Sequence, residues 1–176
     1  MEQAHIHKVL ITGPESTGKS RMSRQLAETY GSVWVPEYAR TYLNDLSRPY
    51  EPDDLRLILR GQLRSEQEYL TKAERYLFCD TGPEVLSIWS QHKYGEVHAE
   101  IEAALQAAEY DFVLLMDIDL PWEPDPLRET PDPEVRQQLL QIYRELLVSL
   151  EWPFRLISGT GPQRVQAAQA ALENFF

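Results

Sequence analysis

The segment LITGPESTGKS, residues 10–20, constrains the fold of this chain more than any other part of its sequence. Four residues separate Gly13 from Gly18, and Lys19 and Ser20 follow directly, which matches the G-x-x-x-x-G-K-[ST] spacing of a phosphate loop. Glycines let backbone N–H groups turn inward around an anion, while the lysine reaches the outer phosphates and the hydroxyl reaches Mg²⁺. The motif predicts that a nucleoside triphosphate is bound by Gly13, Glu15, Ser16, Thr17, Gly18, Lys19 and Ser20.

The residues on either side of this loop support the interpretation. The apolar run IHKVLIT precedes the loop and is typical of a strand, and Met22, Leu26 and Tyr30 recur at a spacing of four after it, which indicates a helix. A helix N-terminus favours phosphate because its free N–H groups and its dipole point at the anion. A chance glycine-rich turn is the alternative, and the strand–loop–helix context argues against it.

Apolar runs alternate with helical patterns along the whole chain. Strands that are apolar throughout and alternate with helices indicate a parallel sheet covered on both faces. The clearest helical patterns cover about 54–76, 97–108 and 134–150, and a last helix follows Pro162. We therefore predict a single α/β domain over residues 1–176, with one core. The apolar runs are IHKVLIT, SVWVP, YLFCD, YDFVLLMD and PFRLIS.

Charge and composition narrow the partners of the chain. A formal net charge of −11 argues against nucleic acid or an anionic membrane, since both need a basic face. The opening segment MEQAHIHKVL has no long apolar stretch, so we expect a cytoplasmic protein without a signal peptide or membrane span. Cys79 is the single cysteine, so a disulfide framework is excluded. His5 and His7 alternate near the first strand, but two histidines without further ligands make a poor metal site.

Polar residues or glycines follow every apolar run. In a parallel α/β sheet the ligand lies beyond the carboxyl ends of the strands, so these residues should gather at the edge that the phosphate loop marks. The edge of a sheet without any function would also carry polar residues. This edge is a candidate site because the predicted phosphate loop lies on it. The residues that follow the later runs are Glu37 and Arg40, Asp80 and Thr81, Asp117 and Asp119, and Gly159 to Arg164.

Roles for these residues follow from the needs of phosphoryl transfer, which are Mg²⁺, cations on the moving phosphate and a group that takes the acceptor's proton. Asp80 is the favoured partner of Ser20 in the Mg²⁺ shell, and Asp117 is the alternative. Glu37 is a candidate base toward an acceptor hydroxyl. A surface salt bridge between Glu37 and Arg40 is an equally weighted alternative.

The proline-rich stretch LPWEPDPLRETPDPEVR, residues 120–136, is predicted to be a surface loop. A long loop inside a compact domain is often a lid, and we favour a lid over a simple linker because Arg128 and Arg136 can close on the phosphates. Solvated loop charge is the alternative for both arginines. Gln62 lies on the apolar stripe of the helix at about 54–76, so its carboxamide needs a hydrogen-bond partner from the protein or from a ligand.

Several segments together resemble the nicotinamide riboside kinase family, which comprises the kinase domain of the bifunctional bacterial NAD-biosynthesis regulator and its stand-alone relatives. The resemblance covers nearly the whole chain. The phosphate loop is shared with many families, whereas EYAR and LPWEPDPLRE are much more specific. The resemblance implies a P-loop kinase fold with a five-stranded parallel sheet and a lid. The segments are GPESTGKS, PEYAR, DL…GQ (54–62), FCDT, IWSQHKYG, YDFVLLMDIDLPWEPDPLRE and ISGTGPQR.

The same resemblance implies that ATP, with Mg²⁺, phosphorylates the ribosyl 5′-hydroxyl of a pyridine nucleoside, with nicotinamide riboside favoured. It is consistent with a catalytic set of Lys19, Glu37, Asp80 and Arg128. The resemblance also places the loop at 159–164 near adenine. We assign Thr81, Arg136, Gly159 and Arg164 to the nucleotide side, and Glu37, Arg40, Gln62 and Trp89 to the acceptor side.

Two departures and two alternatives accompany this hypothesis. The chain has no room for the adenylyltransferase domain of the bifunctional members, so we expect the mononucleotide as the product. Gly82 and Pro83 follow Asp80 and Thr81 where a further polar residue is expected, which bears on the identity of the nucleoside. A kinase of another nucleoside is the first alternative. The second is an ATPase or nucleotide-dependent regulator whose acceptor is water.

Overall fold

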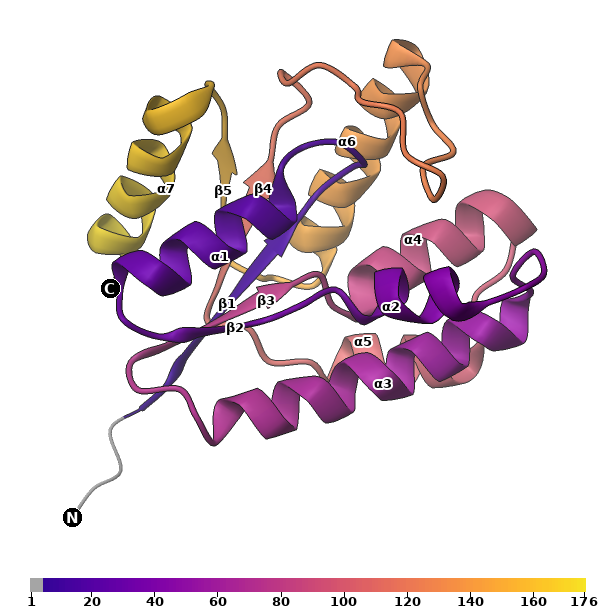
Figure 1. Cartoon of the computed structure of the whole chain (residues 1–176), viewed down its shortest axis with the longest axis horizontal. Helices are drawn as coiled ribbons and strands as arrows, with labels where there is room; N and C mark the ends of the chain where they lie inside the picture. The colour runs from indigo at the N-terminus through magenta and orange to yellow at the C-terminus, as the bar shows by residue number, and fades with distance from the viewer. Residues whose placement is uncertain (1–4) are drawn as a thin grey trace.

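Parallel strands form the centre of the fold in the computed structural model, which describes residues 5–176 (Figure 1). The described strands form a five-stranded sheet in the order β2-β3-β1-β4-β5, so the strand before the phosphate loop is central. All four strand pairings are parallel, which confirms the predicted sheet. The strands are β1 (His7–Thr12), β2 (Val33–Val35), β3 (Tyr76–Asp80), β4 (Phe112–Met116) and β5 (Phe154–Ile157).

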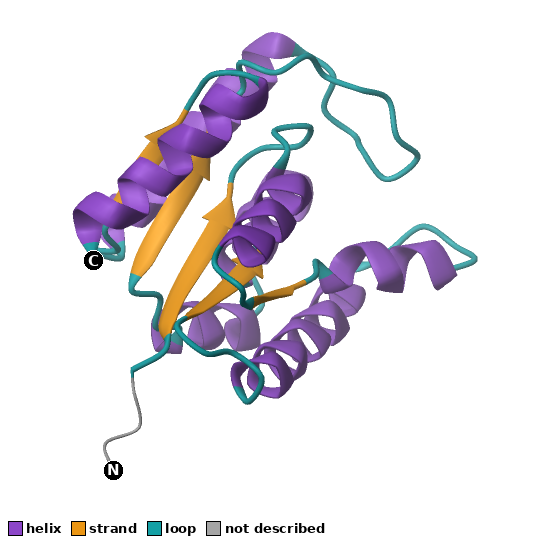
Figure 2. Ribbon diagram, turned by 60° about the vertical axis from the view of Figure 1, so that its left-hand side comes forward, coloured by secondary structure: helices purple, strands orange, loops and turns teal. Residues whose placement is uncertain are grey.

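Helices cover the sheet on both faces, as Figure 2 shows. The helices predicted at 97–108, at 134–150 and after Pro162 correspond to α5, α6 and α7. No helix in the described part of the chain is both long and apolar enough to cross a membrane. The helices are α1 (Lys19–Thr29), α2 (Tyr38–Asp45), α3 (Pro52–Leu70), α4 (Pro83–Tyr94), α5 (Ala99–Ala107), α6 (Pro133–Ser149) and α7 (Gly161–Phe175).

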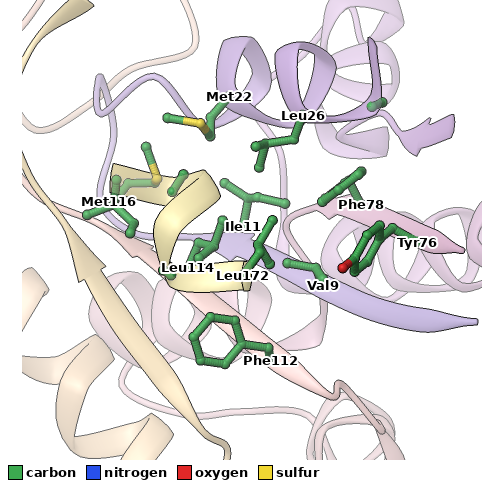
Figure 3. Packing of buried hydrophobic residues seen from close by; sticks show 14 residues of the cluster. Val9, Ile11, Met22, Leu26, Tyr76, Phe78, Phe112, Leu114, Met116 and Leu172 are labelled. Atoms are coloured by element: carbon green, nitrogen blue, oxygen red, sulfur yellow. The ribbon is translucent and has the colours of Figure 1, made fainter. Parts of the chain in front are cut away.

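Side chains of β1 alternate between two cores, one on each face of the sheet. Val9 and Ile11 belong to the core that α1 and α7 cover, and Leu10 belongs to the core that α4 and α6 cover. Figure 3 shows the first of these cores, in which Leu26 of α1 and Leu172 of α7 lie around Ile11. All five side chains are buried, so the loop that follows β1 rests on packed groups from both faces.

The helix predicted at about 54–76 is α3, and its predicted end was wrong. α3 begins at Pro52, where Glu51 and Asp54 form a capping box, and ends at Leu70. The chain then turns through residues 71–75 before it enters β3. The apolar residues near the predicted end belong partly to that turn and to the strand, and they continue the helical spacing by chance.

The sequence pattern did not predict α2 and α4. α2 is only eight residues long, and the apolar residues of α4 are concentrated in the short run 85–89, so neither helix shows a long apolar repeat along the sequence. α2 packs on α3 at Gly61, where a Cβ would lie 2.0 Å from the ring of Tyr38. This close approach places Glu37, the N-cap residue of α2, at the carboxyl edge of the sheet.

The predicted lid at 120–136 begins and ends earlier in the structure. The loop between β4 and α6 covers residues 117–132, and α6 begins at Pro133. Asp132 caps this helix, because its carboxylate accepts hydrogen bonds from the backbone N–H groups of Glu134 and Val135. Arg136 therefore lies on the first turns of α6 instead of in the loop.

Candidate active site

Glycines shape the phosphate loop at its two ends. Gly13 has a φ of +136°, and a Cβ at this position would lie 2.7 Å from the backbone oxygen of Met116 on β4. Gly18 has a φ of +79° and is the N-cap residue of α1. Both positions need the conformational freedom or the missing side chain that only glycine provides. The two glycines of the motif thus turn the chain from the central strand into the helix.

The interior of the loop is held by its own polar groups. The hydroxyl of Thr17, which is completely buried, donates a hydrogen bond of 2.8 Å to the carbonyl of Pro14. Nζ of Lys19 donates to the same carbonyl at 2.8 Å. The lysine ammonium is therefore kept at the loop, where it can exchange a single carbonyl partner for phosphate oxygens.

A cavity of about 500 Å³ opens beside the phosphate loop. The loop and the start of α1 form its polar wall, and α2, α3 and α4 form an apolar wall with Leu43, Leu55, Ile58, Val85 and Leu86. This volume and this mixture of walls suit a small organic ligand. The predicted site residues on its lining are Gly13, Glu15, Ser16, Thr17, Gly18, Lys19, Ser20, Glu37, Arg40, Trp89 and Arg128.

The other predicted site residues do not belong to the cavity lining. Arg136 and Arg164 among them support the lining from behind, through carbonyl groups of the phosphate loop. Most of them are buried, and their hydrogen bonds show what each one holds in place. They are Gln62, Asp80, Thr81, Arg136, Gly159 and Arg164.

Asp80 lies at the end of β3 and is 1% exposed. Its Oδ1 has no hydrogen-bond partner among residues 5–176. Burial and then the charge of Glu37 raise the pKa of Asp80, against the Ser20 hydroxyl and Lys19, which lower it, and the resulting pKa is about 7. A buried carboxylate oxygen without a partner, beside a hydroxyl, fits the ligand shell of a hard divalent cation.

Asp117, the alternative to Asp80, is already engaged by the protein. Its Oδ1 accepts a hydrogen bond of 2.8 Å from the backbone N–H of Ile118. Its Oδ2 accepts one of 2.7 Å from the hydroxyl of Ser158. The geometry therefore favours Asp80 over Asp117 for a metal role.

Glu37 and Arg40 are on the lining but do not pair with each other. In the described residues, the ion pair of Arg40 is with Asp125 of the lid loop, at 3.0 Å. The salt-bridge alternative for Glu37 is thus not formed. Its carboxylate lies near Asp80, as the effect on the pKa of that residue shows.

Gln62 uses its carboxamide to join two parts of the site. Its Oε1 accepts from the backbone N–H of Tyr38 at 2.9 Å, and its Nε2 donates to the backbone carbonyl of Thr81 at 3.3 Å. Thr81 has a φ of +67°, which is uncommon for a residue with a side chain. Both partners of Gln62 are protein groups. Glu37 directly precedes Tyr38 and Asp80 directly precedes Thr81, so Gln62 helps to fix the positions of both carboxylates.

Two buried arginines support the phosphate loop through its carbonyl groups. Arg136 donates to the carbonyl of Glu15 at 3.3 Å, and burial lowers the pKa of its guanidinium. Arg164 donates to the carbonyl of Thr17 at 3.2 Å and to that of Asp117 at 2.7 Å. The expectation that Arg136 closes over the phosphates from a lid was wrong, because a helix holds it behind the loop.

The lid loop lies against the phosphate loop and α4. The carboxylate of Glu15 accepts hydrogen bonds of 3.0 Å from the backbone N–H groups of Glu129 and Thr130. Lys93 of α4 pairs with Glu129 at 3.0 Å. Arg128 donates to the carbonyl of Glu123 within the lid and lines the cavity. The hydroxyl of Ser16 accepts a hydrogen bond of 2.9 Å from the backbone N–H of Glu123 and donates one of 3.3 Å to the carbonyl of Pro121, so two side chains of the phosphate loop contact the lid directly.

Sequence reasoning missed Glu84, which is completely buried at the start of α4. Its Oε1 accepts from the hydroxyl of Thr12 at 2.8 Å and from the backbone N–H of Gly82 at 3.1 Å. Burial raises the pKa of this carboxyl to about 7. Glu84 ties the last residue of β1 to the loop after β3. The sequence signal that could have identified this buried carboxyl is that Glu84 is the only acidic residue in the otherwise largely apolar segment GPEVLSIW.

The sheet order, the phosphate loop on the central strand and the covering lid define a P-loop kinase fold. A family model described as an AAA domain matches residues 8–164, and the chain belongs to that family.

Two curated relatives of this chain are both NadR proteins. The chain is 24% identical over 148 residues to the trifunctional NAD biosynthesis/regulator protein NadR of Escherichia coli (strain K12), covering 81% of this chain and 36% of the relative. The chain therefore spans about a third of the length of that relative. This match, the family model and the structural matches below confirm the relationship that the sequence segments indicated.

Solved structures show the same fold. Two crystal structures of NadR protein, one in complex with NR and one with NAD and AMP-PNP, match with a TM-score of 0.77 at 19% and 18% identity. They cover 97% of this chain and 51% and 49% of theirs. Thymidylate kinase from Ehrlichia chaffeensis matches with a TM-score of 0.67 at 13% identity, covering 97% of this chain and 98% of its own.

Proposed function

We propose that this protein transfers the γ-phosphate of ATP to the 5′-hydroxyl of a pyridine nucleoside, with nicotinamide riboside as the substrate and nicotinamide mononucleotide as the product. One observation carries the proposal. A single cavity joins the phosphate loop to an apolar chamber, and the carboxylate of Glu37 lies on the lining of that cavity. The NadR structure in complex with NR, and the one with AMP-PNP, support the choice of acceptor and donor.

The phosphate end of the cavity can bind a triphosphate with groups already in place. The N-terminus of α1 and the backbone of the loop supply N–H donors, and Lys19 supplies a mobile charge. Ser20 and Asp80 fit the Mg²⁺ ion that the reaction needs. A Mg²⁺ ion bound there supplies neutralisation of charge on the outer phosphates.

The apolar end of the cavity suits the base of a nucleoside. Leu55 and Ile58 of α3 face Val85 and Trp89 of α4 across this chamber. The ribose would lie between the base and the phosphate loop, beside Glu37. There the Glu37 carboxylate accepts the hydroxyl proton, and the lid with Arg128 excludes water and places a cation near the transferred phosphate.

Turnover assays with and without a nucleoside test this proposal. Purified protein is incubated with Mg·ATP and a panel of nucleosides, and the product is identified by its mass. We expect nicotinamide riboside to stimulate ADP release and to gain one phosphate. If no nucleoside stimulates ATP consumption, the acceptor is water and the chain is an ATPase or regulator.

The variant Glu37→Gln sharpens the same test. It keeps the shape of the site and removes the proton acceptor, so we expect transfer to fall about 10²–10⁴-fold while ATP affinity is unchanged. Asp45→Asn is the matched control, because Asp45 is exposed at the other end of the same helix. Equal activity of both variants would remove Glu37 from the mechanism.

A further inference from the structure

A second cluster of ligating side chains lies at the other end of the sheet. His5 precedes β1, His7 is the first residue of β1, and Asp111 directly precedes β4. Each offers one ligand atom, and these atoms all lie within 4.8 Å of one another. The phosphate loop follows the opposite end of β1. The fold therefore supplies the third ligand that the sequence around the two histidines lacks.

Backbone contacts fix the carboxylate of this cluster. Oδ2 of Asp111 accepts a hydrogen bond of 2.7 Å from the backbone N–H of Lys8, and the N–H of Asp111 donates to the carbonyl of Lys8 at 2.9 Å. These two bonds leave Oδ1 facing Nε2 of His5, at 3.2 Å. One carboxylate oxygen is thus oriented toward the histidines before any ion binds.

The ring of His7 is held in place by aromatic neighbours. Its centroid lies 4.1 Å from that of Phe176 and 4.9 Å from that of His5. Nδ1 of His7 is buried and has no hydrogen-bond partner in the described part of the chain. A buried polar atom without a partner is costly, and an imidazole nitrogen in this position is a typical metal ligand.

We propose that His5, His7 and Asp111 bind a divalent transition-metal ion, for which Zn²⁺ is the best fit. Two imidazole nitrogens and one carboxylate oxygen form a common three-ligand set, and water completes the tetrahedron. Bonds of about 2.0–2.1 Å to Zn²⁺ bring tetrahedral ligand atoms to roughly 3.3 Å apart. The exposed side chain of His5 can make the required small movement.

The position of this site assigns it a structural role. The ion would join the start of β1 to the turn before β4, two segments 103 positions apart in the chain. It lies at the opposite end of the sheet from the phosphate loop, so it takes no part in phosphoryl transfer. An ion that binds only the folded chain stabilises it by mass action.

Metal analysis on protein without an affinity tag tests the site. After treatment with a chelator, Zn²⁺ is titrated into the full chain and followed by calorimetry, and Co²⁺ is used as a spectroscopic probe. We expect one Zn²⁺ per chain, a higher melting temperature with Zn²⁺, and visible absorption from tetrahedral Co²⁺. The variants His5→Ala and Asp111→Asn should each weaken binding at least about a hundredfold, since each removes a direct ligand.

Two controls separate this site from other binding. His92→Gln removes a histidine outside the cluster, and Asp80→Asn removes the carboxylate near the phosphate loop, so both should keep the Zn²⁺ stoichiometry. The side-chain oxygen of the Asp111→Asn variant can still accept the hydrogen bond from the backbone N–H of Lys8, so we expect this variant to fold. The proposal fails if His5→Ala and Asp111→Asn bind Zn²⁺ as the parent does, or if Asp80→Asn abolishes binding.

Discussion

The phosphate loop and the lid loop both line the cavity, but they are held in very different ways. Two arginines that are 5% and 4% exposed, Arg136 and Arg164, donate to carbonyl groups of the phosphate loop from behind. The lid is held through Arg40–Asp125 and Lys93–Glu129, pairs between partly exposed side chains. Glu15 and Ser16 join the two loops directly, through hydrogen bonds to the backbone of the lid.

This difference predicts which loop moves. Ion pairs between exposed side chains contribute about 0–1 kcal/mol each, and water can replace the hydrogen bonds of Glu15 and Ser16, so the lid can leave the cavity at a modest cost. Breaking the contacts of the buried arginines would leave charged groups and carbonyls without partners, which costs far more. We therefore expect a preformed phosphate loop under a lid that opens for substrate, and four variants test this contrast.

Arg128→Ala in the lid should have the largest effect. An arginine that stabilises charge on a transferred phosphate contributes roughly 10³–10⁵ in rate, so we expect kcat to fall by that factor. The melting temperature should stay close to that of the parent, because the side chain contacts a single lid carbonyl. Arg144→Ala, an exposed residue of α6, is the control. A fall of less than about tenfold would make Arg128 a solvated charge.

Lys19→Ala in the phosphate loop should follow, with kcat lower by about 10²–10³ and weaker ATP binding. The loop keeps its shape, because the glycines and the buried arginines do not depend on this ammonium. Steady-state kinetics and thermal melting measure the two effects, with Arg24→Ala on the exposed face of α1 as the control. Full activity with normal melting would disprove the assignment of the phosphate loop.

Glu84→Gln tests the buried carboxyl that bonds to Thr12, just before the phosphate loop, through the pH dependence of protein stability. The pKa of Glu84 in the folded protein, about 7, lies above its ordinary value of 4.5. The folded state therefore binds more protons between these values, and its stability falls as pH rises from about 4.5 to 7 and is constant above. The glutamine does not titrate, so from pH 5 to pH 8 we expect the variant to gain up to about 3 kcal/mol relative to the parent.

Urea denaturation of both proteins across this pH range measures the difference. The titration of Asp80 is common to parent and variant and cancels in the comparison. Glu102→Gln, an exposed residue of α5, should follow the parent at every pH. Parallel stability curves for Glu84→Gln and the parent would show that Glu84 is ionised throughout.

Lys93→Ala should have the smallest effect on stability, below about 1 kcal/mol, because its pair with Glu129 is partly exposed. Glu129 belongs to the lid and Lys93 to α4, so the loss of this pair loosens the lid from α4. We expect faster proteolysis within residues 117–132 and unchanged cleavage elsewhere. Lys72→Ala, which breaks an exposed pair with Glu68 just past the end of α3, is the control. Identical lid cleavage in both variants would mean that other contacts hold the lid.

The sequence was sufficient for features that depend on neighbouring residues. The phosphate loop and the strands could be predicted because spacing and apolar runs determine them locally. The fold supplies features that depend on distant residues. Examples are Glu84 bonded to Thr12, Arg136 placed behind the loop, and Asp111 placed beside His5 and His7. No local sequence pattern indicates such contacts. The helices α2 and α4 were missed because their apolar stretches are too short to show a helical repeat.

The central position of β1 has a consequence for how the protein is made. β1 is synthesised before both strands that flank it, since it pairs with β3 at residues 76–80 and with β4 at residues 112–116. Until β4 leaves the ribosome, the buried residues Val9, Leu10 and Ile11 lack their pairing partners on that strand. Long-range pairing of this kind slows folding and leaves apolar surface open to aggregation. The newly made N-terminal third is therefore the part of this chain that most needs protection by a chaperone.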